Sequence, residues 1–245
     1  MKLINFLLNN MRRTMKQAQP PTLILKTADK EALSVAVELL RSGKVIALPT
    51  DTIYGLACIA NNSDAVKKLY DIKGRNEEKP VAICVGHYED VKRYGRVPQE
   101  LSMELLEKLL PGPVTIVLKK SESLNNPYLN PGTSKIGIRI PNCTFIQNLC
   151  QELNEPIALT SANRSSEPSS LNIYEFQNLW PSLAAVIDGG ALSNTEEQRK
   201  GSTVMDLSKM PSCKIIREGT SYEETKMLLE SHNIILEWTI NDKIS

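Results

Sequence analysis

The sequence predicts a single α/β or α+β domain, and three observations carry that expectation. A chain of 245 residues with 41% hydrophobic and 23% charged residues has the composition of an ordinary globular protein with one sizeable core. From about Leu23 onward, short apolar runs alternate with segments of helical periodicity. No internal repeat interrupts this alternation. A helix bundle and a β-sandwich are therefore both disfavoured.

The first elements follow from apolar periodicity and turn residues. Asp29–Arg41 places its apolar residues on one helical face, and Gly43 is a normal stop signal. Val45–Leu48 is a short β run that ends at Pro49, so Thr50–Gly55 is expected to be a loop at the carboxyl end of a strand. Such loops often carry functional residues.

The remaining elements follow from the same two periods. Helices are expected at Ser63–Ile72, Gln99–Leu110, Phe145–Leu153 and Tyr222–Leu229. Strands are expected at Val81–Val85, Val114–Leu118, Ile136–Ile140, Pro156–Leu159, Ala184–Ile187, Thr203–Leu207 and Lys214–Ile216. Lys73 and Arg75 then lie at a helix-to-strand junction.

Charge and residue usage exclude several classes of function. A net charge of +1 does not support protein-wide attraction to nucleic acid or to a membrane, so any positive site must be built locally. The five cysteines form no C-x-x-C pair, and their odd number fits reduced thiols in an intracellular compartment. The sequence has two histidines, which leaves few candidate ligands for a zinc site and few candidate bases for a Ser-His nucleophile system. No metal-ligating residues are expected.

Residues 1–22 are expected to form a flexible segment ahead of the main domain at 23–232, with a tail at 233–245. The segment carries basic residues before the first acid at Asp29, and the apolar run Leu3–Leu8 is typical of mitochondrial presequences. This run is too short to cross a bilayer. A cytoplasmic location is expected, with mitochondrial import as an addition and a plain disordered tail as the alternative.

Phosphate binding would depend on side-chain cations. Neither a G-x-x-x-x-G-K-[ST] loop nor a G-x-G-x-x-G turn occurs in the sequence. Lys73 and Arg75 lie two apart, with Lys79 close behind, and an Arg fork suits phosphate or carboxylate. The alternative for this cluster is a solvated basic turn.

Arg139 is unusual because it lies inside the apolar run Ile136–Ile140, where an unpaired charge would be expensive to bury. Strand alternation places Gly137 and Arg139 on the same face, so the glycine would leave room for a ligand beside the guanidinium. The alternative is an edge-strand arginine that faces solvent.

Two further segments, Thr160–Asn163 and Gly201–Thr203, supply hydroxyl and amide groups that orient a ligand without charge. Each segment taken alone is only a turn signal. Ser161 is a poor candidate nucleophile because no histidine lies near it in the sequence.

Taken together, these segments resemble the YrdC family in order and spacing. The motifs are Lys44–Leu56, Lys73–Arg75 with Lys79-Pro80, Ile138–Pro141, Thr160–Asn163, Ser202–Val204 and Ile216–Gly219. The resemblance covers roughly Leu23 to Leu229 and makes 23–232 the catalytic domain. It implies a twisted mixed sheet flanked by helices around a deep, positively charged cavity.

The resemblance also implies an activity. Family members join L-threonine, bicarbonate and ATP into threonylcarbamoyl-AMP, with pyrophosphate as the second product and Mg²⁺ bound with the ATP. A separate tRNA threonylcarbamoyltransferase complex then modifies adenosine 37 of tRNA to N6-threonylcarbamoyladenosine.

Residue roles carry over position by position. Thr52, Arg139 and Ser202 match threonine-binding positions, and Cys84 stands where many members have a threonine-contacting histidine. The positions that contact ATP are Arg75, Lys79, Ser161, Ser169 and Arg217. Lys73 and Asn163 belong to the same signature and are expected, with Arg75, to complete the phosphate and carbonate site. No general base is evident, and Asp51 is a candidate only because it lies beside Thr52.

Two other functions compete with this one. A basic concave surface could bind double-stranded RNA through phosphate contacts, with strong salt dependence and no ATP requirement. Related domains also occur in carbamoyl-transferring maturation enzymes that use carbamoyl phosphate, which carry additional zinc-finger and acylphosphatase regions.

Overall fold

The computed structural model describes residues 22–74 and 80–237. The expectations for the first 21 residues, for Arg75 and Lys79 and for residues 238–245 lie outside these ranges.

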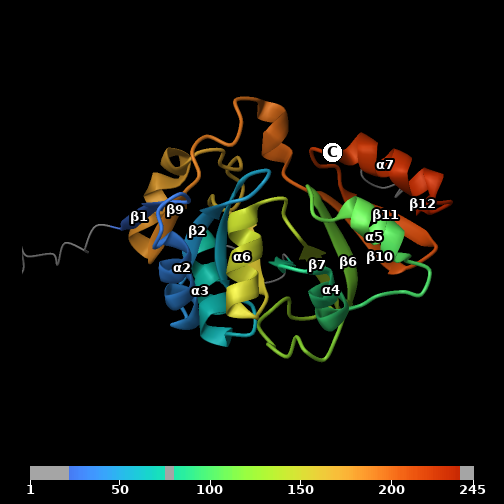
Figure 1. The fold of residues 1–245 in the computed structure, drawn as a ribbon, viewed down its shortest axis with the longest axis horizontal. Coiled ribbons are helices and arrows are strands. Elements are labelled where there is room, and N and C mark those ends of the chain that lie inside the picture. Colours follow the sequence, from blue (N-terminus) through green and yellow to red (C-terminus); the bar gives the residue numbers. More distant parts are fainter. Residues whose placement is uncertain (1–21, 75–79, 238–245) are drawn as a thin grey trace, which may run out of the picture.

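One mixed sheet runs through the whole molecule (Figure 1). Its strand order is β1-β9-β2-β3-β8-β4-β7-β6-β10-β11-β12, and β5 pairs with β6. Parallel and antiparallel neighbours alternate irregularly: β2 is parallel to β9 but antiparallel to β3, and β4 is parallel to β7 but antiparallel to β8. The predicted mixed sheet is thereby confirmed.

The strands have the following bounds: β1 Leu23–Lys26, β2 Ile46–Pro49, β3 Tyr54–Ile59, β4 Ala82–Cys84, β5 Gly95–Arg96, β6 Val114–Lys120, β7 Lys135–Arg139, β8 Ile157–Ser161, β9 Ala185–Asp188, β10 Thr203–Lys209, β11 Ser212–Arg217 and β12 Ile235–Glu237. The helices are α2 Ala32–Arg41, α3 Ser63–Lys73, α4 Tyr88–Tyr94, α5 Met103–Leu109, α6 Thr144–Leu153 and α7 Tyr222–Ser231. Two 3₁₀ segments are η1 Ile173–Ser182 and η2 Glu196–Lys200.

The sheet separates two apolar clusters. The smaller one joins α2 and α6, which pack against each other, to strand residues that include Leu48 and Cys84. The larger one gathers residues of α3, α4, α5 and α7 with strand residues such as Ile83 and Ile138. Because side chains alternate along a strand, neighbours such as Ile83 and Cys84 face opposite sides of the sheet.

Beside α6, this arrangement leaves the face of the sheet open over β4, β7, β6 and β10. Cys84 belongs to the cluster under α6, and Leu159 packs against that cluster, yet both also line a large cavity. The cavity therefore lies on the same face of the sheet as α2 and α6, beyond the region that these helices cover.

Several expected boundaries were wrong. Tyr54 and Gly55 were expected in a loop but begin β3, and their backbone pairs with β2 and β8. The helix expected from Gln99 begins only at Met103, where the Ser102 side chain caps it. The main domain does not end at 232, because Ile235–Glu237 pairs with β11. The three boundaries differ for one reason: strand pairing and helix caps determine where an element begins and ends, and apolar periodicity does not.

Candidate active site

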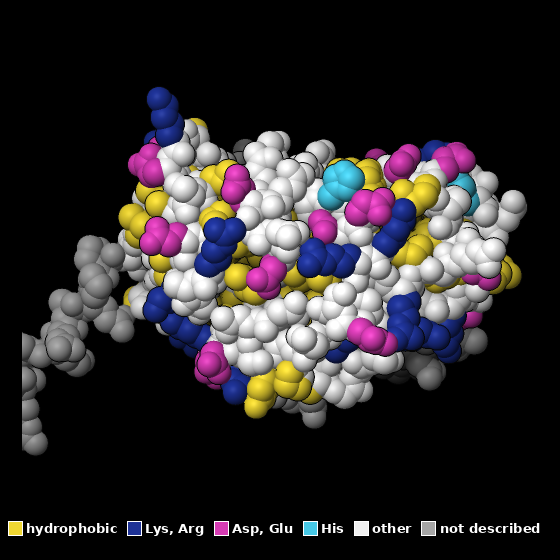
Figure 2. Space-filling view, turned by 60° about the horizontal axis from the view of Figure 1, so that its bottom comes forward, with side chains coloured by type: hydrophobic (Ala, Val, Ile, Leu, Met, Phe, Trp, Pro, Cys, Tyr) yellow, Lys and Arg dark blue, Asp and Glu magenta, His cyan; other side chains and the backbone are white. Residues whose placement is uncertain are grey.

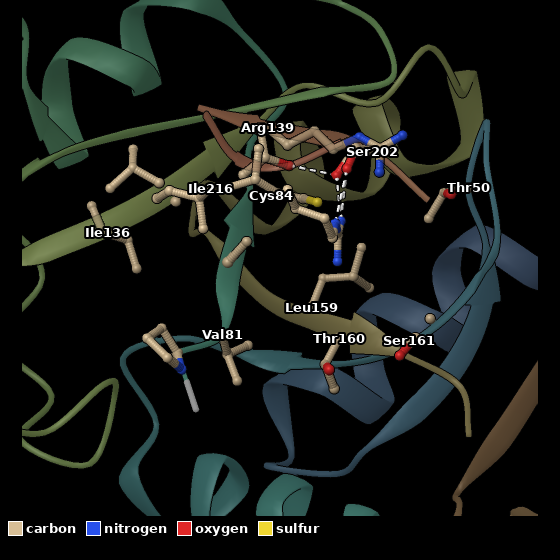
Figure 3. Close-up of a pocket in the computed structure, with 18 of the residues that line it drawn as sticks. Thr50, Val81, Cys84, Ile136, Arg139, Leu159, Thr160, Ser161, Ser202 and Ile216 are labelled. Carbon is tan, nitrogen blue, oxygen red and sulfur yellow. Dashed lines mark hydrogen bonds between the residues drawn. The ribbon is translucent and has the colours of Figure 1, made fainter. Parts of the chain in front are cut away.

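The open face of the sheet holds a cavity of about 560 Å³ (Figure 3). Figure 3 shows Arg139, Cys84 and Ser202 grouped at one end, and Thr160 and Ser161 at another edge. The charged side chains among its lining residues are Lys135, Arg139, Asp206 and Arg217. Residues of seven strands line the cavity, namely β3, β4, β6, β7, β8, β10 and β11, so residues far apart in the sequence converge here.

Small residues hollow the floor. Ala82 pairs with Leu159 on β8, and Gly137 pairs with Val117 on β6. A Cβ atom built on Gly137 would lie 3.0 Å from the Thr115 Cγ2 and 3.3 Å from the Ala82 Cβ. Any larger residue at 137 would therefore occupy cavity space. Gly137 and Arg139 both line the cavity, as strand alternation predicted.

Arg139 is buried and held by four hydrogen bonds. Its Nε donates to the Gly112 carbonyl at 3.2 Å, and Nη1 and Nη2 each donate to the Thr52 hydroxyl at 3.2 Å. Nη2 also donates to the Asp51 carboxylate, with side chains only 7% and 11% exposed. The alternative of a solvent-facing edge arginine was thus wrong. Of the five guanidinium N–H groups, four are used by partners in the described part of the chain, and one on Nη1 points to a ligand role.

The turn between β2 and β3 places Asp51 and Thr52. The Thr50 hydroxyl accepts from the backbone N–H groups of Thr52 and Ile53, at 3.0 and 3.1 Å, and donates to the Ile53 carbonyl. The second Asp51 oxygen accepts from the backbone N–H of Asn142 at 3.1 Å. Both carboxylate oxygens of Asp51 are therefore occupied, which favours a role in holding Arg139 over a role as general base.

Ser202 lies directly before β10, between two partners. Its hydroxyl is 2.8 Å from the Thr115 hydroxyl, and Arg217 Nη2 donates to it at 3.1 Å. Arg217 also donates to the Ser202 carbonyl from Nε and Nη2, at 3.1 and 2.8 Å. Arg217 is otherwise exposed on β11, so its guanidinium reaches the cavity from the rim.

Lys73 lies at the end of α3 and is only 3% exposed. Asn62 caps the start of α3, and Gly74, with a φ of 55°, ends it in the left-handed region that glycine tolerates. The Lys73 ammonium donates to the Ser161 carbonyl at 2.7 Å, to the Ser161 hydroxyl at 3.2 Å and to the Asn163 Oδ1 at 2.6 Å. For Lys73, the alternative of a solvated basic turn was wrong.

Cys84 faces Arg139 across the β4–β7 pair. It is 1% exposed, and burial raises the pKa of its thiol to about 12, although the nearby Arg139 charge acts in the opposite direction. The thiol is therefore uncharged at neutral pH. A cysteine here fills less space than a histidine and brings no charge into the cavity.

Two cavity residues escaped the sequence analysis. Lys135 on β7 and Asp206 on β10 form an ion pair with Nζ and Oδ2 2.5 Å apart. Burial opposes ionisation of Asp206, but hydrogen bonds from Lys135 and Ser208 lower the pKa of its carboxyl. The signal was present: an acid inside the apolar run Thr203–Leu207 is as unusual as Arg139 in its own strand.

Ser169 also lines the cavity, whereas Arg75 and Lys79 fall outside the described residues. Among residues 22–74 and 80–237, no group of three or more His, Cys, Asp or Glu side chains is placed to hold a metal ion. In the same ranges, no helix is both long enough and apolar enough to span a membrane.

Comparison with known proteins gives consistent results. The Sua5/YciO/YrdC family model, described as "Telomere recombination", matches residues 38–219. A Bos taurus protein named threonylcarbamoyl-AMP synthase is 51% identical over 209 residues, which are 84% of this chain and 74% of the relative. A Homo sapiens protein of the same name is 52% identical over 202 residues, covering 82% of this chain and 71% of the relative.

Solved structures agree with the observed topology. A crystal structure of P. abyssi Sua5 complexed with L-threonine superposes with a TM-score of 0.78 at 28% identity, covering 91% of this chain and 64% of that one. This chain therefore spans less than two thirds of P. abyssi Sua5. The structure of E. coli YciO has a TM-score of 0.69 at 25% identity and covers 81% of this chain and 94% of its own. The chain belongs to the Sua5/YciO/YrdC family.

Proposed function

We propose that this protein is a threonylcarbamoyl-AMP synthase, which forms L-threonylcarbamoyladenylate and pyrophosphate from L-threonine, bicarbonate and ATP. One observation carries the proposal: Arg139, Ser202 and Arg217 line the cavity from three separate segments, and the Thr52 hydroxyl accepts hydrogen bonds from Arg139, in a chain about half identical to proteins named for this activity. Such convergence of hydroxyl and guanidinium groups suits two anionic substrates.

On the threonine side, Arg139 offers its remaining N–H to the amino acid carboxylate. Thr52 and Ser202 add hydroxyls, and Asp51 fixes the plane of the guanidinium. Because Asp51 already balances the charge of Arg139, this site binds a carboxylate by directed hydrogen bonds more than by net charge. Cys84 contributes a neutral wall beside it.

On the nucleotide side, Ser161, Ser169 and Arg217 line the cavity. Lys73 uses three bonds to fix Ser161 and Asn163, so its main effect on a phosphate is to place those groups and to supply a buried positive charge. Arg75 and Lys79 are proposed to complete this side on the strength of the family resemblance. Mg²⁺ is proposed to arrive with the ATP phosphates, as part of the nucleotide substrate.

The proposed reaction has two steps. The neutral threonine amine attacks bicarbonate carbon and water leaves, which gives an N-carboxylate. A carboxylate oxygen of that group then attacks the α-phosphorus of ATP, and the bond to pyrophosphate breaks. Both reactants in the second step are anions, so Arg217 and Lys73 lower its barrier by charge neutralisation, and Arg139 lowers it by positioning the threonine carboxylate. No covalent bond to the protein is required.

The product is a mixed anhydride and hydrolyses readily, so it must be consumed quickly. We propose that it passes to a separate tRNA threonylcarbamoyltransferase complex, which makes N6-threonylcarbamoyladenosine at adenosine 37 of tRNA. The proposed location is cytoplasmic, with additional mitochondrial import directed by residues 1–22. Microscopy of fluorescent fusions with and without these residues separates the two locations.

Direct binding of double-stranded RNA is not favoured. Cationic and anionic side chains are interspersed on the face shown in Figure 2, and the net charge is +1. The relatives are named for synthase activity. The carbamoyl phosphate reaction of maturation enzymes is tested by offering that compound in place of bicarbonate.

The deciding experiment measures pyrophosphate release from ATP and bicarbonate, with and without L-threonine. Release is expected to require threonine, and Ser202→Ala is expected to raise the KM for threonine. Arg96→Ala, which removes an exposed arginine paired only loosely with Glu122 at 3.7 Å, serves as the matched control and should leave the rate unchanged. Pyrophosphate release by the pure, folded protein at the same rate with and without threonine would contradict the proposal.

A further inference from the structure

Two loops border the cavity on the side of Ser169 and Ser202. The first, residues 162–172, follows β8 and carries Ser169; the second, residues 189–202, runs from β9 to β10 and ends at Ser202. In Figure 1 the second loop, drawn in orange, crosses above the sheet from β9 to β10. A backbone hydrogen bond joins the two loops where the Leu192 N–H donates to the Leu171 carbonyl at 2.9 Å.

Arg199, in η2 on the second loop, makes the other connection. Its Nη1 donates to the Ser169 carbonyl at 2.7 Å and to Glu175 Oε2 at 2.6 Å. Its Nε donates to both oxygens of Glu196, at 3.0 and 2.9 Å. The Arg199 side chain is 23% exposed, far less than the 85% of Glu196. One guanidinium thus ties its own segment to the loop that carries Ser169.

Glu175 bonds both Arg199 and the end of the first loop. Its Oε2 accepts from the Leu171 N–H at 3.1 Å, and its Oε1 accepts from the Asn172 side chain at 2.7 Å. The hydrogen bond from Arg199 is the main cause that lowers the pKa of the Glu175 carboxyl, so the pair stays charged at neutral pH. Glu175 therefore holds both the end of the first loop and the arginine that reaches across to it.

The two serines depend on Arg199 to different degrees. Ser202 has its own supports, because its hydroxyl meets Thr115 and Arg217, and Thr203 pairs directly with β6. Ser169 lies in irregular chain, and its carbonyl is bonded by Arg199. Loss of Arg199 should consequently displace Ser169 more than Ser202.

We propose that Arg199, with Glu175, is a positioning residue for the nucleotide side of the cavity: it holds the loop of Ser169 against the segment that leads to Ser202. This inference rests on the proposed function for its kinetic consequence, since Ser169 is assigned there to ATP. The bracing itself is a property of the loops and does not depend on the activity.

The kinetic test compares Arg199→Ala with Lys200→Ala. The two residues are adjacent in η2, and each pairs with a glutamate three positions earlier, but the Lys200 side chain is 50% exposed and reaches Glu197 without bonding the loop of Ser169. Arg199→Ala is expected to raise the KM for ATP about tenfold, equivalent to about 1.4 kcal/mol, with the KM for threonine changed less than about twofold. Lys200→Ala should match the wild type. Equal losses for both substrates, or no difference between the variants, would overturn the proposal.

A second measurement needs no substrate. Amide hydrogen exchange of residues 163–172 is expected to quicken in Arg199→Ala and in Glu175→Gln, and to stay at the wild-type rate in Lys200→Ala. Glu175→Gln keeps the shape of the side chain, so it decides the matter if Arg199→Ala does not fold. Unchanged exchange in a folded Glu175→Gln protein overturns the positioning role even if the wild type is an active synthase. If exchange quickens in both variants but the wild-type protein shows no synthase activity, only the proposed function is refuted.

Discussion

Asp51→Asn isolates the part of the site in which charge balance matters most. The side chains of Asp51 and Arg139 are 11% and 7% exposed, and their ion pair fixes the position of the Arg139 guanidinium. Asparagine keeps the size of the side chain and an acceptor oxygen, but it removes the negative charge. Arg139 then remains buried as a cation, and its other partners within residues 22–74 and 80–237 are the neutral Thr52 hydroxyl and Gly112 carbonyl.

The expected cost is large for a single-atom change. Removing one partner of a buried ion pair typically costs about 3–5 kcal/mol, because the other charge is left uncompensated. The lower end applies here, about 3 kcal/mol, because neutral acceptors still surround Arg139. For a chain of this length, each kcal/mol lowers Tm by about 2–4 °C, so the expected fall is about 6–12 °C.

The assay is thermal unfolding followed by circular dichroism, with Asp64→Asn as control. Asp64→Asn is the same substitution in an exposed ion pair, because Asp64 is 95% exposed and lies 3.8 Å from the Lys67 ammonium. This control should shift Tm by no more than about 2 °C. Added L-threonine should stabilise Asp51→Asn more than the wild type, because the ligand carboxylate replaces the lost charge. A Tm for Asp51→Asn equal to that of Asp64→Asn would refute the assigned role of the ion pair.

Three further changes test other parts of the site. Gly137→Val should lower threonine-dependent pyrophosphate release more than about tenfold, since its side chain fills cavity space next to Thr115. The free energy of unfolding in urea should fall by only about 1–3 kcal/mol. A fully active variant would contradict the placement of Gly137 at the substrate cavity. Lys73→Met should destabilise the protein by about 1–3 kcal/mol for each buried acceptor that it leaves without a partner, and the Asn163 amide oxygen is the first of these. A variant as stable as the control Lys67→Met would disprove the role of the Lys73 hydrogen bonds. The pKa of the Cys84 thiol is raised to about 12 by burial, so above about pH 9 the unfolded thiol ionises and the folded one does not, and stability falls with rising pH. Cys84→Ala should reduce that fall by about 1.4 kcal/mol per pH unit in urea titrations, and an unchanged slope would show that the thiol is not protected.

Residue chemistry predicted the site better than it predicted the boundaries of elements. Arg139 stood out because a charge inside an apolar strand needs a partner, and the structure supplies one in Asp51. That partner could not be chosen from the sequence, since 88 positions separate the two residues and the β2–β3 turn brings them together. The roles assigned to individual residues remain predictions.

The contributions of Lys135, Asp206 and Arg199 were missed for a different reason. Asp206 stands out as an acid inside an apolar run, but its partner could not be chosen from the sequence, because only the register of β7, β6 and β10 shows that Lys135 and Asp206 meet in the cavity. Arg199 lies in a polar stretch typical of solvated loops, and its contact with Ser169 spans 30 positions. Long-range pairing of strands and loops, which no local pattern encodes, decided these cases.

The most direct test of the central claim is the identity of the product. Purified protein would be given ATP, L-threonine and isotope-labelled bicarbonate, and the reaction would be analysed by mass spectrometry. The account predicts an adenylate that contains threonine and carries the label, formed together with pyrophosphate. Free AMP without a labelled threonine adduct, at any threonine concentration, would contradict it.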